Sequence, residues 1–234
     1  MKYCFDMDET ICLTPSSRKY EEAVPYTKVI KKINELYESG NHITIFTARG
    51  GTSGVNYRST TLAQLFYWGV KFHRLIDQGK PDYDIFIDDK AITSSTWRKN
   101  EGLKIIGFVA SAFDLLHAGH CLYLKEAKSV CDHLIAGLHY DPSKERAGKN
   151  KPIQSIIERE TQLLSVKYVD EVIIYETEND LSELLKQIKP DIRVLGSDAK
   201  DKPITGEQYC GSIYYHERDH NWSSTNLRER IINA

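Results

Sequence analysis

Short apolar runs alternate with longer amphipathic stretches over residues 1–90. The apolar runs predict strands at residues 2–5, 42–46, 71–76 and 83–87. Apolar side chains recur with a helical period over residues 24–37, where Gly40 follows as a stop, and a second helix is expected over residues 60–68. This alternation is typical of a parallel sheet covered by helices.

The pattern decays after Asp89 into a polar stretch, residues 94–102, which we interpret as a linker. Beyond it the alternation resumes, with strands expected at residues 104–109, 133–138, 171–175, 192–195 and 212–216. The helices of this part are expected at residues 117–130, 157–164, 180–187 and 226–232. We therefore predict two α/β domains, residues 1–100 and 103–234.

The composition fits a folded protein and excludes several classes. With 41% hydrophobic and 27% charged residues, the chain can bury a core. Because 31 basic residues face 33 acidic ones, no general basic surface for nucleic acid is expected. All apolar runs are shorter than the ~20 residues that a membrane span needs. The first residues also lack the apolar core of a signal peptide, so we expect a cytoplasmic protein that binds neither nucleic acid nor membranes.

The cysteines add nothing to the chemistry. There are five, without any C-x-x-C spacing, and an odd count fits a reducing compartment better than a disulfide framework.

Polar side chains that carry chemistry stand at the ends of the strands expected in the first domain. The set consists of Asp6 and Asp8 after the first strand, Thr47 after the second, Lys80 before the fourth, and Asp88 with Asp89 after the fourth. Ligands gather outside the carboxyl ends of strands in open α/β sheets, so we expect these groups to converge at one edge.

Such a set can hydrolyse a phosphate monoester. One carboxylate can attack phosphorus to form an aspartyl-phosphate, and a second, two residues on, can protonate the leaving oxygen. Mg²⁺ can offset the repulsion between the anions, while the hydroxyl and the ammonium hold the phosphoryl oxygens. Any single one of these carboxylates is better explained as a solvated loop residue or a helix cap, but the whole set in this order favours the chemistry.

In order and type, these residues resemble the four motifs of the haloacid dehalogenase superfamily of phosphatases: D-x-D-x-T, Ser/Thr, Lys and an acidic pair. The resemblance implies a small uncapped Rossmann-like domain in which Asp6 is the nucleophile and Asp8 the acid/base. It also implies Thr47 and Lys80 as phosphate ligands, with Lys71 as the alternative lysine, and a Mg²⁺ site. The metal residues would be Asp6, Asp8, Asp88 and Asp89. Residues 46–50 and 87–90 are similar to members associated with surface-polysaccharide synthesis.

A second candidate site lies where the strand at residues 104–109 leads into the next helix. His117 and His120 are expected on one face of its first turn, where free N–H groups and the positive end of the helix dipole attract phosphate. Gly119 is expected to leave room for that phosphate. The chemistry served is attack by a phosphate oxygen on the α-phosphorus of a nucleoside triphosphate, which needs donors for the growing charge. A metal site is the alternative, but Zn²⁺ would need further ligands.

Several motifs accompany the H-x-G-H core: Lys149 to Pro152 with Arg159, residues 167–172, residues 196–198, and residues 218–225. Together they resemble the cytidylyltransferase family of nucleotidyltransferases, and within it the glycerol-3-phosphate cytidylyltransferases, over residues 104–232. The resemblance implies a second Rossmann-like domain in which His117 and His120 stabilise the transition state. The nucleotide-binding residues it implies are Ser111, Ala112, Phe113, Asp114, Gly119, Lys149, Lys151, Arg159, Gly196, Asp198, Arg218, Ser223, Ser224 and Thr225.

Two details of this resemblance leave alternatives open. Ser224 or Thr225 opens the last expected helix and is expected to cap it. The hydroxyl either also contacts an anion or serves as a helix cap alone. Ser111 stands where the family usually has glycine, which would crowd the turn beside the nucleotide.

Both resemblances together predict a bifunctional enzyme. The second domain would transfer a nucleotidyl group, CMP from CTP, to a phosphorylated alcohol or sugar and release pyrophosphate. The first would be a Mg²⁺-dependent phosphatase acting on a related ester in the synthesis of a surface polysaccharide precursor. Arg218, at its spacing before residues 223–225, favours CTP. Because the family includes adenylyltransferases that activate heptose phosphates, ATP is the alternative nucleotide.

A nucleotide-binding protein with one inactive domain is a further alternative function. The family commonly forms dimers, so the resemblance also implies a homodimer through the nucleotidyltransferase domain.

Overall fold

The structure is a computed structural model that describes residues 1–15, 17–80, 90–146 and 148–233. It divides into two compact units, Met1–Leu103 and Lys104–Ala234. The domain boundary predicted from the sequence, between residues 100 and 103, lies within a few residues of this division. The strand expected at residues 83–87 lies outside the described residues.

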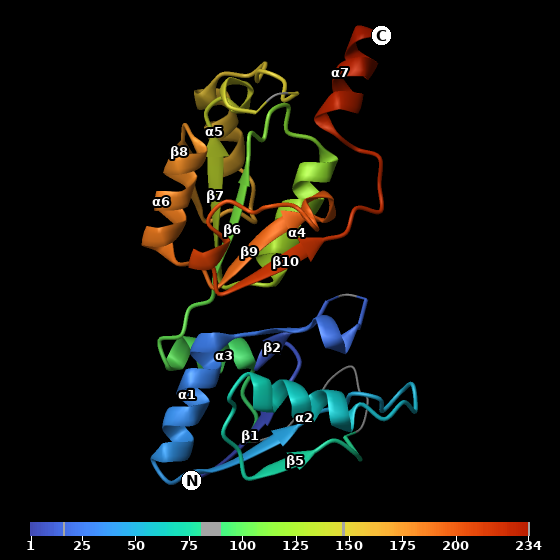
Figure 1. The fold of residues 1–234 in the computed structure, drawn as a ribbon, viewed down its shortest axis with the longest axis vertical. Coiled ribbons are helices and arrows are strands. Elements are labelled where there is room, and N and C mark those ends of the chain that lie inside the picture. Colours follow the sequence, from blue (N-terminus) through green and yellow to red (C-terminus); the bar gives the residue numbers. More distant parts are fainter. Residues whose placement is uncertain (16, 81–89, 147, 234) are drawn as a thin grey trace. The chain divides into compact units, whose positions relative to one another are not determined.

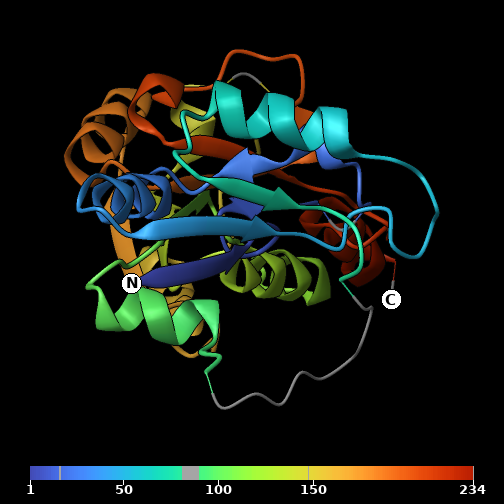
Figure 2. The ribbon, with the colours of Figure 1, turned by 90° about the horizontal axis from the view of Figure 1, so that it is seen from below.

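The first unit is built on a parallel sheet with the strand order β1 (Lys2–Asp6), β4 (His42–Phe46) and β5 (Arg74–Ile76) (Figure 1). Figure 2 shows these strands side by side, in dark blue, blue and teal, with their arrowheads pointing the same way. Asp6 is paired with Phe46 in the register of β1 and β4. Because the strands are parallel, Asp6 and Thr47, the residue after Phe46, lie at the same edge of the sheet.

Two helices pack onto this sheet through apolar faces. α1 (Thr27–Glu38) buries Val29, Ile30 and Ile33, and α2 (Arg58–Tyr67) buries Leu65. The helix expected over residues 24–37 starts later than predicted because β3 (Val24–Pro25) is extended and pairs antiparallel with β2 (Cys12–Leu13). The short 3-10 helix η1 (Tyr20–Glu22) lies between β2 and β3.

The linker predicted at residues 94–102 is wrong. Most of it forms α3 (Ser94–Asn100), whose N-cap residue Thr93 accepts a hydrogen bond from the backbone N–H of Thr96. Trp97 is buried, and its ring meets that of Phe5 edge-on, with the centroids 5.1 Å apart. An aromatic anchor on the first strand therefore makes this polar stretch part of the first unit.

The second unit has a five-stranded parallel sheet. Its order is β10 (Ser212–His216), β9 (Ile192–Gly196), β6 (Ile106–Ser111), β7 (His133–His139) and β8 (Glu171–Tyr175). From β6 the chain adds β7 and β8 on one side and then returns to add β9 on the other side. The strand order thus reverses between β6 and β9, and ligands bind outside the carboxyl ends of strands at such a switch point.

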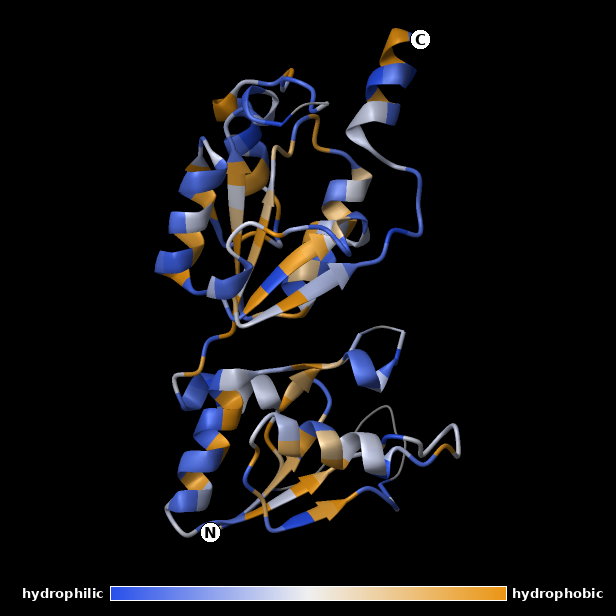
Figure 3. Cartoon of the chain, viewed as in Figure 1, coloured by the Kyte–Doolittle hydropathy of each residue, from blue (hydrophilic) through white to orange (hydrophobic). Residues whose placement is uncertain are grey.

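Amphipathic helices cover this sheet. They are α4 (Ala118–Ser129), α5 (Ile156–Leu164) and α6 (Glu178–Ile188). The last helix, α7 (Ser224–Ile232), buries none of its residues and extends away from the sheet (Figure 1). Short 3-10 turns also occur: η2 (Pro142–Lys144), η3 (Ser197–Ala199) and η4 (Glu207–Tyr209). Leu181 and Leu185 of α6 pack with Phe108, Ile135 and Tyr175 of the sheet. Figure 3 shows the result as orange strands beside helices, such as α1 and α6, that mix orange with blue. Among the described residues, no helix is long and apolar enough to cross a membrane.

Candidate functional site

Asp6 and Lys80 form an ion pair at the carboxyl edge of the first sheet. The Lys80 Nζ lies 2.7 Å from Asp6 Oδ1, which also accepts a hydrogen bond from the backbone N–H of Met7 at 2.8 Å. The alternative lysine, Lys71, instead pairs with Glu38 at the surface. The geometry therefore places Lys80 beside the predicted nucleophile.

Asp8 is held by a residue that the sequence reasoning missed. The Arg49 side chain is 1% exposed, and its Nη2 and Nε donate to Asp8 at 2.7 and 3.0 Å. The hydroxyl of Thr14 also donates to Asp8, and Arg49 Nη1 donates to Gln64 Oε1 at 2.6 Å. Burial acts to lower the pKa of Arg49, but the hydrogen bond and charge of Asp8 outweigh it, so the pKa of Arg49 is raised. The sequence offered one indication of this contact, a basic residue two positions after Thr47.

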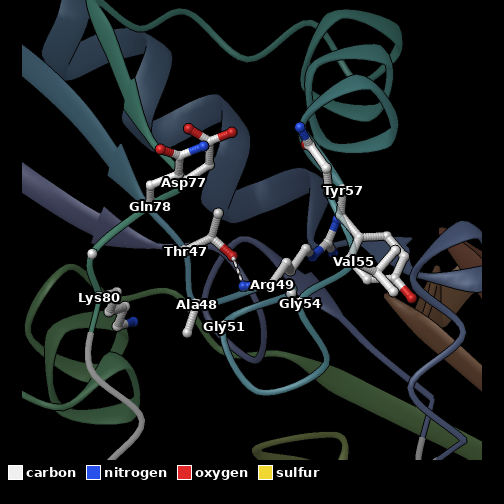
Figure 4. A pocket seen from close by; sticks show the side chains of 13 residues that line it. Thr47, Ala48, Arg49, Gly51, Gly54, Val55, Tyr57, Asp77, Gln78 and Lys80 are labelled. Carbon is white, nitrogen blue, oxygen red and sulfur yellow. Dashed lines mark hydrogen bonds between the residues drawn. The ribbon is translucent and has the colours of Figure 1, made fainter.

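A pocket of about 260 Å³ opens beside this ion pair (Figure 4). Its lining includes Thr47, Arg49, Asp77 and Lys80, but neither Asp6 nor Asp8. The dashed line in Figure 4 is the bond from the backbone N–H of Arg49 to Thr47 Oγ1, 3.2 Å long. The pocket therefore brings the two predicted phosphate ligands, Thr47 and Lys80, to one cavity.

The loop after Thr47 depends on a glycine. Gly50 has a φ of +83°, and a Cβ at this position would lie 1.9 Å from the carbonyl oxygen of Val55. Any other residue would collide with backbone, so Gly50 fixes the shape of the pocket wall.

The predicted Mg²⁺ residues are described only in part. Asp6 and Asp8 offer carboxylate oxygens, which are the ligands that Mg²⁺ prefers, on neighbouring positions at the strand end. Asp88 and Asp89 lie outside the described residues. In this structure Asp6 pairs with Lys80 and Asp8 with Arg49, so the Mg²⁺ site stays a prediction.

His117 and His120 stack at the start of α4 in the second unit. Their ring centroids are 3.9 Å apart and their planes differ by 20°. His117 is the N-cap rather than a residue of the first turn, and its Nδ1 accepts from the backbone N–H of His120 at 3.4 Å. An imidazole that is neutral and accepts at Nδ1 carries its proton on Nε2, so Nε2–H is left to donate to a ligand.

Burial keeps both imidazoles neutral. It lowers the pKa of His120 to about 3, with further lowering by His117 and Arg218. It also lowers the pKa of His117, helped by His220 and Arg218. The Nδ1 of His120 is buried without a hydrogen-bond partner in the part of the chain that the structure describes. This pair can thus supply N–H donors without holding a charge of its own.

Gly119 is required for packing at the start of α4, and its role in admitting a phosphate stays a prediction. A Cβ on Gly119 would lie 2.8 Å from the carbonyl oxygen of Trp222 and 3.0 Å from the rings of His117 and His220. The rings of His220 and Trp222 stack with centroids 5.0 Å apart. The segment that holds these two side chains therefore crosses the start of α4, which the sequence reasoning missed because it is about a hundred residues away.

Gly196, Asp198 and Arg218 meet outside the carboxyl ends of β9 and β10. A Cβ on Gly196 would lie 2.4 Å from Asp198 Oδ1, and Arg218 Nη2 lies 3.7 Å from that oxygen. The side chains of Arg218 and Asp198 are 53% and 67% exposed, and exposed ion pairs contribute little free energy. Arg218 can therefore leave Asp198 for a nucleotide phosphate at small cost.

Asp114 joins three segments of the second unit. Its carboxylate accepts from the backbone N–H groups of Ile153 and Gln154, each at 3.0 Å, and from Arg228 Nη2 at 2.5 Å. Burial acts to raise the pKa of Asp114, but these hydrogen bonds lower it below its usual value. Its neighbours Phe113 and Leu115 have φ of +46° and +50°, a left-handed backbone that is costly for such residues. The loop after β6 is thus strained and held down by Asp114.

Arg159 is bonded mainly to backbone. Its guanidinium donates to the carbonyl oxygens of Ala112, His139, Tyr140 and Gln154 at 2.7 to 3.2 Å. These four bonds use four of the five N–H groups of the guanidinium. Arg159 therefore shapes the site mainly by holding these loops together. A direct contact between Arg159 and the nucleotide stays a prediction.

The other predicted nucleotide ligands surround this frame. Ser111 ends β6, and Lys149 and Lys151 lie exposed on the loop before α5. The residue that caps α7 is Ser223, which accepts from the backbone N–H of Asn226. The cap expected at Ser224 or Thr225 is therefore wrong by one or two positions. Ser224 Oγ donates to the carbonyl oxygen of Asp114 at 3.0 Å, and Thr225 is exposed.

A parallel sheet with a histidine pair at a helix start beside its switch point defines the class of the second unit as a nucleotidyltransferase-like α/β domain. The chain belongs to the cytidylyltransferase-like family, whose sequence model matches residues 108–230.

Curated relatives carry the same type of region. The chain is 31% identical over 163 residues to the bifunctional protein HldE of Campylobacter jejuni, an alignment that covers 69% of this chain and 35% of the relative. It is 38% identical over 140 residues to HldE of Caulobacter vibrioides, covering 58% of this chain and 28% of the relative. The chain thus spans about a third of the length of the curated relatives it matches.

Among solved structures, a lipopolysaccharide core biosynthesis protein from Thermoplasma volcanium matches 56% of this chain and 88% of its own. The sequence identity is 27% and the TM-score is 0.37.

Proposed function

We propose that the second unit transfers CMP from CTP to a phosphorylated alcohol or sugar and releases pyrophosphate. The observation that carries this proposal is the stacked, neutral pair His117 and His120 at the start of α4, beside the switch point of the sheet. Neutral imidazoles that offer N–H groups, with Arg218 nearby, suit a reaction in which the negative charge on the α-phosphate oxygens grows in the transition state.

The reaction needs no protein nucleophile. An oxygen of the acceptor's phosphate forms a bond to the α-phosphorus of the nucleotide, and the bond from that phosphorus to the α,β-bridging oxygen breaks, so pyrophosphate leaves with the electron pair. His117 Nε2–H and His120 donate to the α-phosphate oxygens as their charge grows. Arg218 binds the phosphates after it leaves Asp198.

The test is a pyrophosphate-release assay of the full chain with each nucleoside triphosphate against a panel of phosphorylated polyols and sugars. We expect turnover with CTP, and we expect His120→Ala to lower kcat by ~10²-fold or more with little change in nucleotide KM. His133→Ala is the matched control, since this partly buried histidine lies away from the start of α4 and pairs with the surface carboxylates of Asp170 and Glu171.

The outcomes separate the proposal from its rivals. Turnover with ATP alone would replace the cytidylyltransferase with an adenylyltransferase of the ADP-heptose type. A comparable rise in nucleotide KM with an unchanged kcat in His120→Ala would make this histidine a ground-state binding residue. The absence of turnover with every nucleotide and acceptor tested would favour a nucleotide-binding protein.

We further propose that the first unit is a Mg²⁺-dependent phosphatase for a related phosphate ester, and that both reactions serve the synthesis of a surface polysaccharide precursor. The support is the convergence of Asp6, Lys80, Asp8 and Thr47 at one sheet edge. Asp6 would attack the phosphoryl group, Asp8 would donate a proton to the leaving oxygen, and Lys80 would turn from Asp6 to the phosphate. Mg²⁺, when bound, would neutralise charge between the carboxylates and the substrate.

A further inference from the structure

A third cluster of ionisable side chains lies outside both sites described so far. His139 is the last residue of β7, Glu145 lies on the loop before α5, and Glu178 is the first residue of α6. Each offers one ligand atom, and these three atoms all lie within 4.8 Å of one another. Side chains from three segments therefore converge at the carboxyl ends of β7 and β8.

The histidine of this cluster is buried, and its ring nitrogens lack hydrogen-bond partners. His139 is 1% exposed, and within the described residues neither Nδ1 nor Nε2 has a hydrogen-bond partner. Its ring packs edge-on against Tyr175, with the centroids 4.7 Å apart. Leaving a buried polar group without a hydrogen bond is unfavourable, and such a group calls for an explanation such as a bound ion.

The carboxylates have partners that explain why they stay together. Glu178 accepts from Arg146 through one oxygen and from the Thr205 hydroxyl through the other, at 2.5 Å. Glu145 Oε2 accepts from the backbone N–H of Glu178 at 2.8 Å. Arg146 is thus the cation that neutralises the cluster in this structure, and none of these bonds uses the imidazole of His139.

We propose that His139, Glu145 and Glu178 bind one divalent transition-metal ion, which takes the place of Arg146. One imidazole nitrogen with two carboxylate oxygens suits Zn²⁺ or a similar ion better than Mg²⁺, which avoids nitrogen. Ligand atoms on one Zn²⁺ ion are roughly 3.5 Å apart, so the cluster must close by about 1 Å. The exposed side chain of Glu145 is free to make that movement.

The environment of the imidazole agrees with this assignment. Burial lowers the pKa of His139, although Glu178 acts to raise it, so the ring is neutral near pH 7 and keeps a lone pair for a metal. The ion would join the loop before α5 to the start of α6. That loop carries Lys149 and Lys151. The role of the ion would therefore be to order a segment next to the proposed transferase site. The inference itself does not depend on the proposed function.

The test is calorimetric titration of the metal-free full chain, without an affinity tag, with Zn²⁺. Asp6→Asn is the background, because it weakens the predicted metal site of the first unit. We expect one tight site, at least tenfold weaker binding after Glu145→Gln, and at least threefold tighter binding after Arg146→Ala, since this change removes the competing cation. Glu171→Gln is the matched control, because Glu171 contacts His133 in another histidine–carboxylate pair at 3.2 Å and should leave the tight site unchanged.

Two further measurements keep the proposal open to refutation. His139→Ala should abolish the tight site while circular dichroism shows a folded protein, and Glu178→Gln serves if that variant does not fold. Binding that Glu145→Gln and Glu178→Gln leave unchanged would overturn the assignment. So would the absence of a tight site both in the background protein and after Arg146→Ala.

Discussion

Arg49 and Asp8 form a buried ion pair with two parallel contacts inside the first unit, the shorter being 2.7 Å between Nη2 and Oδ1. The guanidinium also lies over the ring of Tyr20, 4.6 Å from its centroid. Asp8 therefore has one fixed orientation, set by a residue that follows β4 while Asp8 itself follows β1. The same pair that orients the predicted acid/base also connects two strand ends.

Arg49→Ala should destabilise the first unit strongly. We expect its free energy of unfolding to fall by about 3 kcal/mol, because removing one partner leaves an uncompensated charge in a mostly buried place. Urea unfolding can be followed by the fluorescence of Trp97, which is buried in this unit. Arg58→Ala is the matched control: its pair with Asp77 is half-exposed on the arginine side, so its loss should stay below ~1 kcal/mol. Equal losses in the two variants would show that the Asp8 pair is no stronger than a surface contact.

Asp6→Asn should separate the two activities. The amide keeps the shape of the side chain but cannot attack phosphorus, so Mg²⁺-dependent hydrolysis of a generic phosphate monoester should disappear. Pyrophosphate release by the second unit should stay near normal, because His117 and His120 belong to a separate sheet. Glu38→Gln, a surface change, is the control. Monoester hydrolysis at the unaltered rate in Asp6→Asn would remove Asp6 as the nucleophile.

His120 should make the stability of the second unit depend on pH. Its folded pKa of about 3 lies below the ordinary histidine value, so below about pH 6.5 the unfolded chain binds a proton that the folded one does not. The stability it contributes is therefore full above pH 6.5 and is lost as pH falls towards 3. Between pH 7 and 5, we expect the original chain to lose about 2 kcal/mol more than His120→Gln. Urea unfolding at both pH values measures this, and an identical loss in both proteins would mean that His120 is not held neutral.

The sequence predicted the parts of the fold that depend on local patterns. The strands at residues 42–46, 171–175 and 212–216 agree with the structure because their apolar runs are bounded by clear turns. α3 was missed because one buried aromatic, Trp97, outweighs its polar surroundings. β3 was predicted as part of a helix because two residues are too short a strand to show an alternating pattern. The same limit applies to the sites. Strand ends indicated Asp6 and His117, but Arg49, His220 and Trp222 act through contacts across many positions that no local pattern reveals.

The two proposed activities can share one chain only if the proposed phosphatase spares the transferase's acceptor, because removing the acceptor's phosphate would destroy the substrate. In the described chain only α1, η1 and the short β2–β3 pair lie between β1 and β4, and only α2 lies between β4 and β5. A Gly-rich loop borders the pocket that Thr47 and Lys80 line, which fits an open site with room for a larger or doubly phosphorylated ester. We expect kcat/KM for phosphate release to be at least ~10-fold lower with the true acceptor than with its precursor ester, which is about 1.4 kcal/mol of differential transition-state binding. Once the nucleotide screen identifies the acceptor, phosphate release from it is compared with release from candidate precursors, using Asp6→Asn as the blank. Faster hydrolysis of the acceptor than of every precursor would contradict a sequential pathway and favour a housekeeping role for the first unit.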